Sequence, residues 1–276
     1  MSVQHRKDDV RAAVRDRYGS IARGTSHGCC APGNGGPGEE TSLALGYSAE
    51  ELASVPEGAN MGLGCGHPSA IAALQEGETV LDLGAGGGFD SFLAAKQVGP
   101  TGQVIGVDMT PDMVSKARAN ATKLGARNVS FRLGEIEHLP VADQSVDVIL
   151  SNCVINLSPD KAAVFAEAFR VLRAGGRLAI ADVVAIRALP QSVQNDVAAL
   201  TGCIAGATDV ATVERLLGEA GFADIRVTVK PESRAFIRDW MPGKNIEDYV
   251  ASATIEAIKP DGANVAPSFD GTDDAS

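Results

Sequence analysis

Apolar and polar residues change their spacing regularly along the middle of the chain. From about Gly77 onward, short apolar runs typical of strands alternate with stretches in which apolar residues recur at helical spacing. The predicted strands are 79–84, 103–108, 128–133, 145–152 and 177–184. A first helix is predicted at 86–98. A second begins at Thr110 and Pro111 and stops at Gly125, and a third begins at Ser158 and Pro159 and is ended by Gly175 and Gly176. This alternation predicts an α/β fold, in which a doubly wound, mostly parallel sheet is covered on both faces.

The flanking segments look like appendages to this core. Residues 8–22 predict a short helix, and a Gly- and Pro-rich loop at 24–38 carries two cysteines. After the core we expect a helical stretch at 189–204, a helix at 211–221 and a strand at 224–230. The predicted domain organisation is 1–60 for the N-terminal helix and Cys-bearing loop, 61–230 for the core with a substrate-site insert near 186–210, 231–259 for a C-terminal extension, and 260–276 for an acidic disordered tail.

Composition and charge exclude several classes of protein. Apolar residues make up 45% of the 276 residues and aromatic residues only 4%, so the core is built mainly from Ala, Val, Leu and Ile. A formal charge of -11 has the wrong sign for a nucleic-acid binder. No apolar run approaches the roughly 18 residues of a membrane span, and the charged N-terminus does not look like a signal peptide, so we expect no membrane and a cytoplasmic protein. Five cysteines in a chain of this length predict free thiols in a reducing compartment.

The turn after the first predicted strand is the expected ligand site, because ligands bind beyond the carboxyl ends of parallel strands. It reads DLGAGGGFD, in which Gly84 and Gly86 allow a tight turn and a close approach of the backbone to a ligand. A dinucleotide fingerprint counted from Gly84 needs glycine where Phe89 stands, which argues against a pyrophosphate. Asp108 ends the second strand, where a carboxylate accepts ribose hydroxyls, and Asp82 could hold a cationic amino-acid end.

These features favour S-adenosylmethionine, which has an adenosine, a sulfonium and an amino group but no phosphate. Glu135 and Ile136, after the third strand, are predicted to flank the adenine, the first as an acceptor for its amino group and the second as an apolar face. Met109 and Asn152 complete the predicted cofactor site. The structural alternative is that the glycines only make a turn, that Asp108 only caps the next helix, and that Glu135 and Ile136 are a solvated and a core residue.

A family resemblance becomes specific at this point. The segment 80–184 resembles class I S-adenosylmethionine-dependent methyltransferases, which implies a Rossmann-like sheet. The motifs RYGSIA, GCC, GLGCGHP, DLGAGGGFDSFLAA, GVDMTPDMVSKAR, SNCVINLSPDK and GCIAGA, spread over residues 17 to about 222, resemble the arsenite methyltransferase family. That resemblance implies an enzyme of arsenic detoxification, which moves a methyl group from S-adenosylmethionine to trivalent arsenic.

In that family, cysteines bind the arsenic. Carried over by motif, the resemblance implies that Cys65, Cys153 and Cys203 are arsenic ligands, with a further thiol from Cys29 or Cys30. Soft centres prefer thiolate ligands, and Cys153 lies just past the fourth strand, which agrees with this role. Each cysteine could equally be a small core residue, and the vicinal pair could form a regulatory disulfide. Zinc is a rival ligand for the set His27, Cys29, Cys30, Cys65 and His67, although no finger-type spacing is present.

The implied mechanism needs no general base, because thiolate-bound arsenic attacks through its own lone pair. Catalysis then rests on holding the arsenic and the methyl carbon about 3 to 3.5 Å apart and in line. Loop 24–38 is a candidate lid. The family resemblance implies thioredoxin or glutathione as reductant. Two other functions stay open: a methyltransferase for an organic acceptor such as a quinone or sterol, and a non-catalytic thiol sensor or metalloid-binding protein.

Overall fold

The computed structural model describes residues 3–26, 39–194 and 196–261. At its centre is one sheet with the strand order β3-β2-β1-β4-β5-β8-β7, to which the short β6 is added beside β5. The strands are β1 (Thr79–Leu83), β2 (Gln103–Asp108), β3 (Val129–Leu133), β4 (Val146–Asn152), β5 (Leu172–Ala185), β6 (Thr208–Asp209), β7 (Ala223–Lys230) and β8 (Val250–Ile258). β1 to β5 pair in parallel, whereas β8 is antiparallel to both of its neighbours. The predicted doubly wound, mostly parallel sheet is therefore confirmed.

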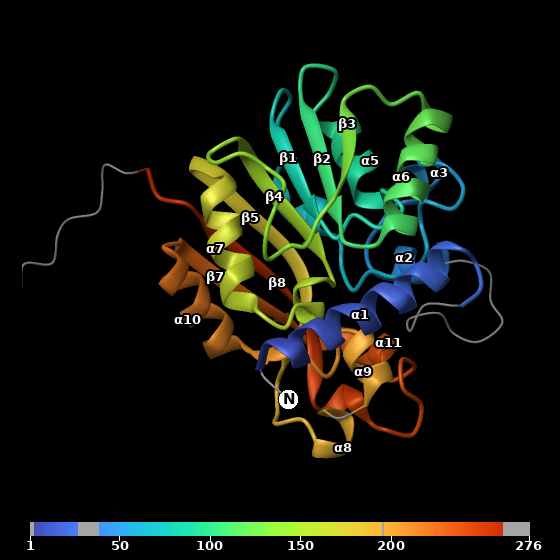
Figure 1. The fold of residues 1–276 in the computed structure, drawn as a ribbon, viewed down its shortest axis with the longest axis vertical. Helices are drawn as coiled ribbons and strands as arrows, with labels where there is room; N and C mark the ends of the chain where they lie inside the picture. The colour runs from blue at the N-terminus through green and yellow to red at the C-terminus, as the bar shows by residue number, and fades with distance from the viewer. Residues whose placement is uncertain (1–2, 27–38, 195, 262–276) are drawn as a thin grey trace, which may run out of the picture.

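Helices cover both faces of this sheet, and their packing follows the alternation of side chains along each strand. Leu81 and Ile149 point to the face covered by α7 and α10, while Val80 and Val148 point to the face covered by α4 and α5. Figure 1 shows α7 and α10 together beside β5, β8 and β7. The longer helices are α5 (Phe89–Gln97), α6 (Pro111–Leu124), α7 (Lys161–Val171) and α10 (Val210–Ala220). Shorter ones are α2 (Glu39–Ala44), α3 (Ala49–Ala53), α4 (Pro68–Ala72), α8 (Gln191–Gln194), α9 (Val197–Thr201) and α11 (Arg234–Ile237), with 3-10 turns η1 (Ile155–Leu157), η2 (Pro231–Ser233) and η3 (Ile246–Asp248).

The sheet continues past the predicted end of the core. We expected 231–259 to be an extension, but β8 lies inside the sheet, between β5 and β7. β5 also begins earlier than expected, and Gly175 and Gly176 lie within it instead of ending the preceding helix. The reason is a contact distant in sequence: the Gly175 N–H donates to the Lys259 carbonyl and the Lys259 N–H donates to Gly176, both at 2.8 Å.

The N-terminal helix α1 (Val3–Ala22) crosses the carboxyl edge of the sheet (Figure 1). It is longer than the predicted 8–22 and packs against α6, α9 and η1. The Tyr18 hydroxyl donates to the Thr201 carbonyl at 3.3 Å, which ties α1 to α9. The predicted helical stretch at 189–204 consists of the two short helices α8 and α9. None of the helices in the described part of the chain has the length and apolar character needed to cross a membrane.

Candidate functional site

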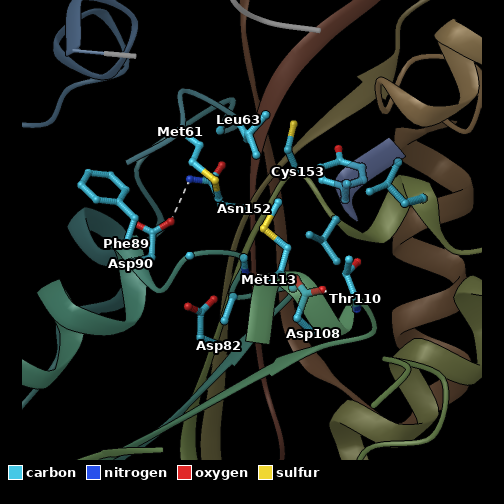
Figure 2. A pocket seen from close by; sticks show the side chains of 18 of the residues that line it. Met61, Leu63, Asp82, Phe89, Asp90, Asp108, Thr110, Met113, Asn152 and Cys153 are labelled. Carbon is cyan, nitrogen blue, oxygen red and sulfur yellow. Dashed lines mark hydrogen bonds between the residues drawn. The ribbon is translucent and has the colours of Figure 1, made fainter. Parts of the chain in front are cut away.

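A cavity opens where β1, β2 and β4 end, at the edge of the sheet that α1 crosses (Figure 2). Its wall combines the turn after β1, the ends of β2 and β4, the segment before α4 and one face of α1. Predicted cofactor residues that line it are Asp82, Gly84, Gly86, Asp108, Met109, Ile136 and Asn152. The cavity therefore lies at the position that the strand-end argument predicted.

The glycine turn is shaped by close packing and by Asp108. Gly84 has φ +67°, and a Cβ placed on it would stand 2.2 Å from a methyl group of Val154, so no other residue fits there. The Gly86 N–H donates to Asp108 Oδ2 at 3.0 Å, and the Thr110 N–H donates to Oδ1 at 2.8 Å. A carboxylate has about four acceptor positions, so Asp108 holds the turn and can still accept further hydrogen bonds from a ligand.

Two buried carboxylates lie on the other side of the turn. Asp82 in β1 accepts a hydrogen bond from the Ser91 hydroxyl at 2.5 Å, and Asp90 in α5 accepts one from the Tyr47 hydroxyl at 2.6 Å. Burial, and then the charge of Asp90, raise the pKa of Asp82; burial also raises the pKa of Asp90. A cationic ligand would stabilise the charged form of these buried carboxylates. This agrees with the predicted role of Asp82 toward an amino group.

Asn152 connects these carboxylates with the cysteine-bearing segment. Its side-chain amide group donates to Asp90 Oδ2 at 3.0 Å, as Figure 2 shows, and to the Gly66 carbonyl at 2.9 Å. Its amide oxygen accepts a hydrogen bond from the Cys65 N–H at 3.0 Å. Asn152 therefore fixes the position of Cys65 relative to the cavity.

Glu135 does not take the position that the sequence predicted. Its carboxylate pairs with Arg11 Nε at 3.3 Å and with Arg15 Nη1 at 3.1 Å, both from α1, and it does not line the cavity. Glu137, two residues later, does line it and is buried, with its carboxylate bound by Arg11 and by the Ser158 hydroxyl. Ile136 reaches the cavity as expected of an apolar face.

Three predicted cysteines converge beside the cavity. Cys65 and Cys153 form a disulfide with a Cα–Cα distance of 5.8 Å, and the Cys203 thiol donates to the Cys153 carbonyl oxygen at 2.7 Å. All three are buried, and Cys153 also lines the cavity (Figure 2). The prediction of free thiols is therefore wrong for Cys65 and Cys153. Segments 88 residues apart bring these two side chains within bonding distance, which local sequence patterns do not reveal.

The backbone at this cluster is strained. Cys153 has φ +58° and Cys203 has φ +63°, a left-handed conformation that non-glycine residues adopt rarely and at a cost. Such strain is concentrated at functional sites, because the surrounding structure must hold it in place. Cys29 and Cys30 lie outside the described residues.

Asp182, in β5, adds a buried charge to the cysteine cluster. One of its carboxylate oxygens and the sulfur atoms of Cys65 and Cys153 all lie within 4.8 Å of one another. Burial raises the pKa of Asp182 to about 6. Sequence reasoning missed Asp182 because it is the one acid within an otherwise ordinary apolar strand.

Tyr47 and Asp90 were missed as well. Asp90 directly follows the glycine turn and Phe89, so its place in the first turn of a helix beside the ligand edge was a usable signal. Tyr47 precedes β1 by more than thirty residues, and nothing local marks it. His67 is the residue before helix α4, and its ring stacks on Tyr47 with the ring centroids 4.0 Å apart.

Comparisons with known proteins identify the family of the chain. A family model described as a methyltransferase domain matches residues 74–221. The arsenite methyltransferase of Halobacterium salinarum is 53% identical over 92% of this chain and 67% of its own length. That of Aquipseudomonas alcaligenes is 40% identical over 93% of this chain and 74% of its own length. The crystal structure of an arsenic(III) S-adenosylmethionine methyltransferase from Chlamydomonas reinhardtii aligns with a TM-score of 0.61 at 39% identity, over 82% of this chain and 75% of that one.

The relatives match most of the chain, and the matched region contains the glycine turn, the strand-end acids and all three clustered cysteines. Both the fold and the family expected from the sequence are confirmed. The chain belongs to the arsenite methyltransferase family of methyltransferases.

Proposed function

We propose that this chain transfers the methyl group of S-adenosylmethionine to trivalent arsenic held by the thiolates of Cys65, Cys153 and Cys203. The observation that carries the proposal is the place of Cys153. It lines the cavity at the ligand edge of the sheet, is bonded to Cys65, and accepts the Cys203 thiol on its carbonyl oxygen. Sulfur atoms from three distant segments thus lie next to the space suited to the methyl donor.

The residues around the cavity fit S-adenosylmethionine. Asp82 and Asp90 offer negative charge for the amino group, and Asp108 retains acceptor positions for ribose hydroxyls. Met109 and Ile136 supply apolar surface for the adenine. Asn152 lines the cavity and holds Asp90 and the Cys65 backbone by hydrogen bonds. When bound, the cofactor supplies a methyl group activated by its sulfonium.

Arsenic binding requires that the Cys65–Cys153 disulfide first be reduced. Thiols displace hydroxyl groups from neutral arsenous acid, each releasing one water, so the acidic protein does not repel its substrate. Soft arsenic favours sulfur over the nearby oxygen ligands. We assign the reduction to thioredoxin or glutathione and place the protein in the cytoplasm, where disulfides in enzymes are usually transient.

The remaining parts of the chain have assigned roles within this proposal. Residues 1–60 supply the helix that crosses the cavity and a loop that contributes Cys29 or Cys30 as a further thiol. Residues 61–230 form the catalytic core, with 186–210 as the substrate-site insert that carries Cys203. Residues 231–259 complete the sheet, and the acidic residues 262–276 lie outside the described residues.

The test is incubation of the reduced protein with labelled S-adenosylmethionine and arsenite, with products identified by mass. Wild type should form methylated arsenic. Cys65→Ser, Cys153→Ser and Cys203→Ser should each lose at least about a hundredfold in rate while binding the cofactor within a few-fold of wild type. The double variant Cys29→Ser, Cys30→Ser measures how much the vicinal pair contributes to the rate of arsenite methylation.

Two outcomes would overturn the proposal. If the Ser variants at 65 and 153 still methylate an organic acceptor such as a quinone, and arsenite is never turned over, the chain is an ordinary small-molecule methyltransferase. If arsenite binds tightly but no methyl group is transferred, the chain is a metalloid-binding protein.

A further inference from the structure

The arsenic site proposed above does not account for Asp182. An oxygen of its carboxylate and the sulfurs of Cys65 and Cys153 lie within 4.8 Å of one another, and all three residues are at least 96% buried. They come from three elements: the turn before α4, the residue after β4, and the carboxyl-terminal part of β5. A buried carboxylate beside two sulfurs is not needed for a three-thiolate arsenic site, because arsenic prefers sulfur.

The Asp182 carboxylate is also held rigidly. It accepts hydrogen bonds from the Ile155 N–H at 2.9 Å, the Asn156 side-chain amide at 2.9 Å and the Val183 N–H at 2.7 Å. The backbone N–H of Asn156 and the cation of Lys161 also stabilise its charge, so a metal ion would bind a carboxylate that is already held in place. Metal-ligating carboxylates are typically hydrogen-bonded by neighbouring groups in this way, because those bonds orient them.

We propose that reduction of the Cys65–Cys153 disulfide creates a Zn²⁺ site made of Cys65, Cys153 and Asp182. Two thiolates and a carboxylate are all ligands that zinc accepts, and three protein ligands leave a fourth position open. In a tetrahedral zinc site the ligand atoms are roughly 3.5 to 3.8 Å apart, as the zinc–sulfur and zinc–oxygen bond lengths require. The three atoms already satisfy a spacing below 4.8 Å, so small movements complete the site.

The redox state of the cysteines controls this site. A phosphine reduces the disulfide with two electrons and becomes a phosphine oxide, taking its oxygen from a water molecule whose two protons go to the cysteine sulfurs. A thiol reductant supplies two electrons and two protons and is itself oxidised to a disulfide. Zinc then displaces both thiol protons to solvent as it forms two zinc–sulfur bonds. The disulfide form offers no thiolate, so it does not bind the ion.

Zinc and arsenic would share two ligands and differ in the third. Arsenic takes the Cys203 sulfur, whereas zinc takes the Asp182 oxygen. Zinc should therefore compete with arsenite. The zinc site itself stands independently of the proposed function, and only the competition rests on it.

The experiment measures zinc binding by the full chain carrying Cys29→Ser and Cys30→Ser, so that only the described cysteines remain. The protein is reduced with a phosphine, and zinc is titrated against a chromophoric chelator without the methyl donor. We expect one Zn²⁺ per reduced chain and none per oxidised chain. Asp182→Asn and Cys65→Ser should each weaken zinc binding at least tenfold, while Cys203→Ser should change it by less than threefold.

Arsenite binding by the same variants provides the crossed control. Cys203→Ser should lose far more affinity for arsenite than Asp182→Asn does, the reverse of their order for zinc. Circular dichroism and cofactor binding check that each variant is folded, and Cys65→Ser tests the site independently if Asp182→Asn fails this check. The proposal is overturned if the reduced chain binds no zinc, or if a folded Asp182→Asn chain binds it as tightly as its parent. Methylation of arsenite without zinc in the same preparations would leave the proposed function intact in either case.

Discussion

The side-chain amide oxygen of Asn152 accepts a hydrogen bond from the backbone N–H of Cys65 at 3.0 Å. The same side chain donates to Asp90 and to the Gly66 carbonyl, so one residue at the end of β4 joins the proposed cofactor site to the proposed arsenic site. A residue placed in this way couples the geometry of the two sites, because any movement of its amide changes both.

Replacing Asn152 with Ala should therefore weaken both ligands. We expect a loss of about tenfold or more in S-adenosylmethionine affinity and a similar loss in arsenite affinity, since buried hydrogen-bond partners left unsatisfied cost about 1 to 3 kcal/mol. Titration calorimetry on the reduced protein measures both. The matched control is Asn128→Ala, which removes two side-chain hydrogen bonds, to Ala95 and Gly99, away from the cavity. Equal losses of affinity in the two variants would contradict the coupling role.

Gly84 and Gly125 offer a matched pair for testing the glycine turn. Both have φ +67°, but an added Cβ meets Val154 at 2.2 Å in the first and nothing within 4 Å in the second. Gly125→Ala should reduce the free energy of unfolding by about 1 kcal/mol, whereas Gly84→Ala should cost about 2 kcal/mol more and abolish cofactor binding. Urea denaturation with and without S-adenosylmethionine distinguishes them. Similar denaturation midpoints would show that the turn tolerates a side chain.

Sequence patterns predicted the parts of the site that depend on one strand end or one turn. β2 has the predicted bounds, and Asp108 lies at its carboxyl end as expected, because the end of a parallel strand fixes where its last side chain points. The glycine turn was predictable for the same local reason.

The features that the sequence did not reveal depend on contacts between distant segments. Glu135 was expected at the adenine but is held away from the cavity by Arg11 and Arg15, more than 100 residues earlier. Gly175 and Gly176 resemble a helix stop, yet they pair with Lys259, the residue just after β8. A pair of glycines looks the same in the sequence whether it ends a helix or lies within a strand. Only the contacts of the folded chain decide between the two.

Asp82 should give the folded protein a characteristic pH dependence. Burial and the charge of Asp90 raise its pKa above the unfolded value of about 4, so the folded state binds more protons than the unfolded state above that pH. The free energy of unfolding should fall as the pH rises from about 4 toward the raised pKa, while affinity for the cationic amino group of the cofactor should increase.

Denaturation of wild type and Asp82→Asn across this range measures the effect, and the variant should show a flatter pH profile. Asp209→Asn is the control of opposite sign, because hydrogen bonds from Thr212 lower the pKa of this exposed residue. Parallel profiles for wild type and Asp82→Asn would mean that Asp82 does not carry the proton.

Arg11 should contribute more to stability than its neighbour on α1. Its side chain is 10% exposed and pairs with Glu137, which is 3% exposed, whereas Arg15 is 38% exposed and pairs with the partly exposed Glu135. Arg11→Met keeps most of the packing but leaves Glu137 buried without its cation, at a cost of about 3 to 5 kcal/mol. Arg15→Met should cost less than about 1 kcal/mol, because exposed ion pairs contribute little.

The same pair of variants tests whether α1 closes the cavity. Arg11 and Glu137 both line it, so Arg11→Met should also weaken S-adenosylmethionine binding, whereas Arg15→Met should leave that affinity unchanged. Urea denaturation gives the stabilities and calorimetry gives the affinities. If Arg11→Met lowers stability and leaves cofactor affinity at the wild-type value, the helix only completes the fold. If Arg11→Met lowers both the stability and the affinity for S-adenosylmethionine, the buried Arg11–Glu137 pair is one of the contacts that shape the cofactor site.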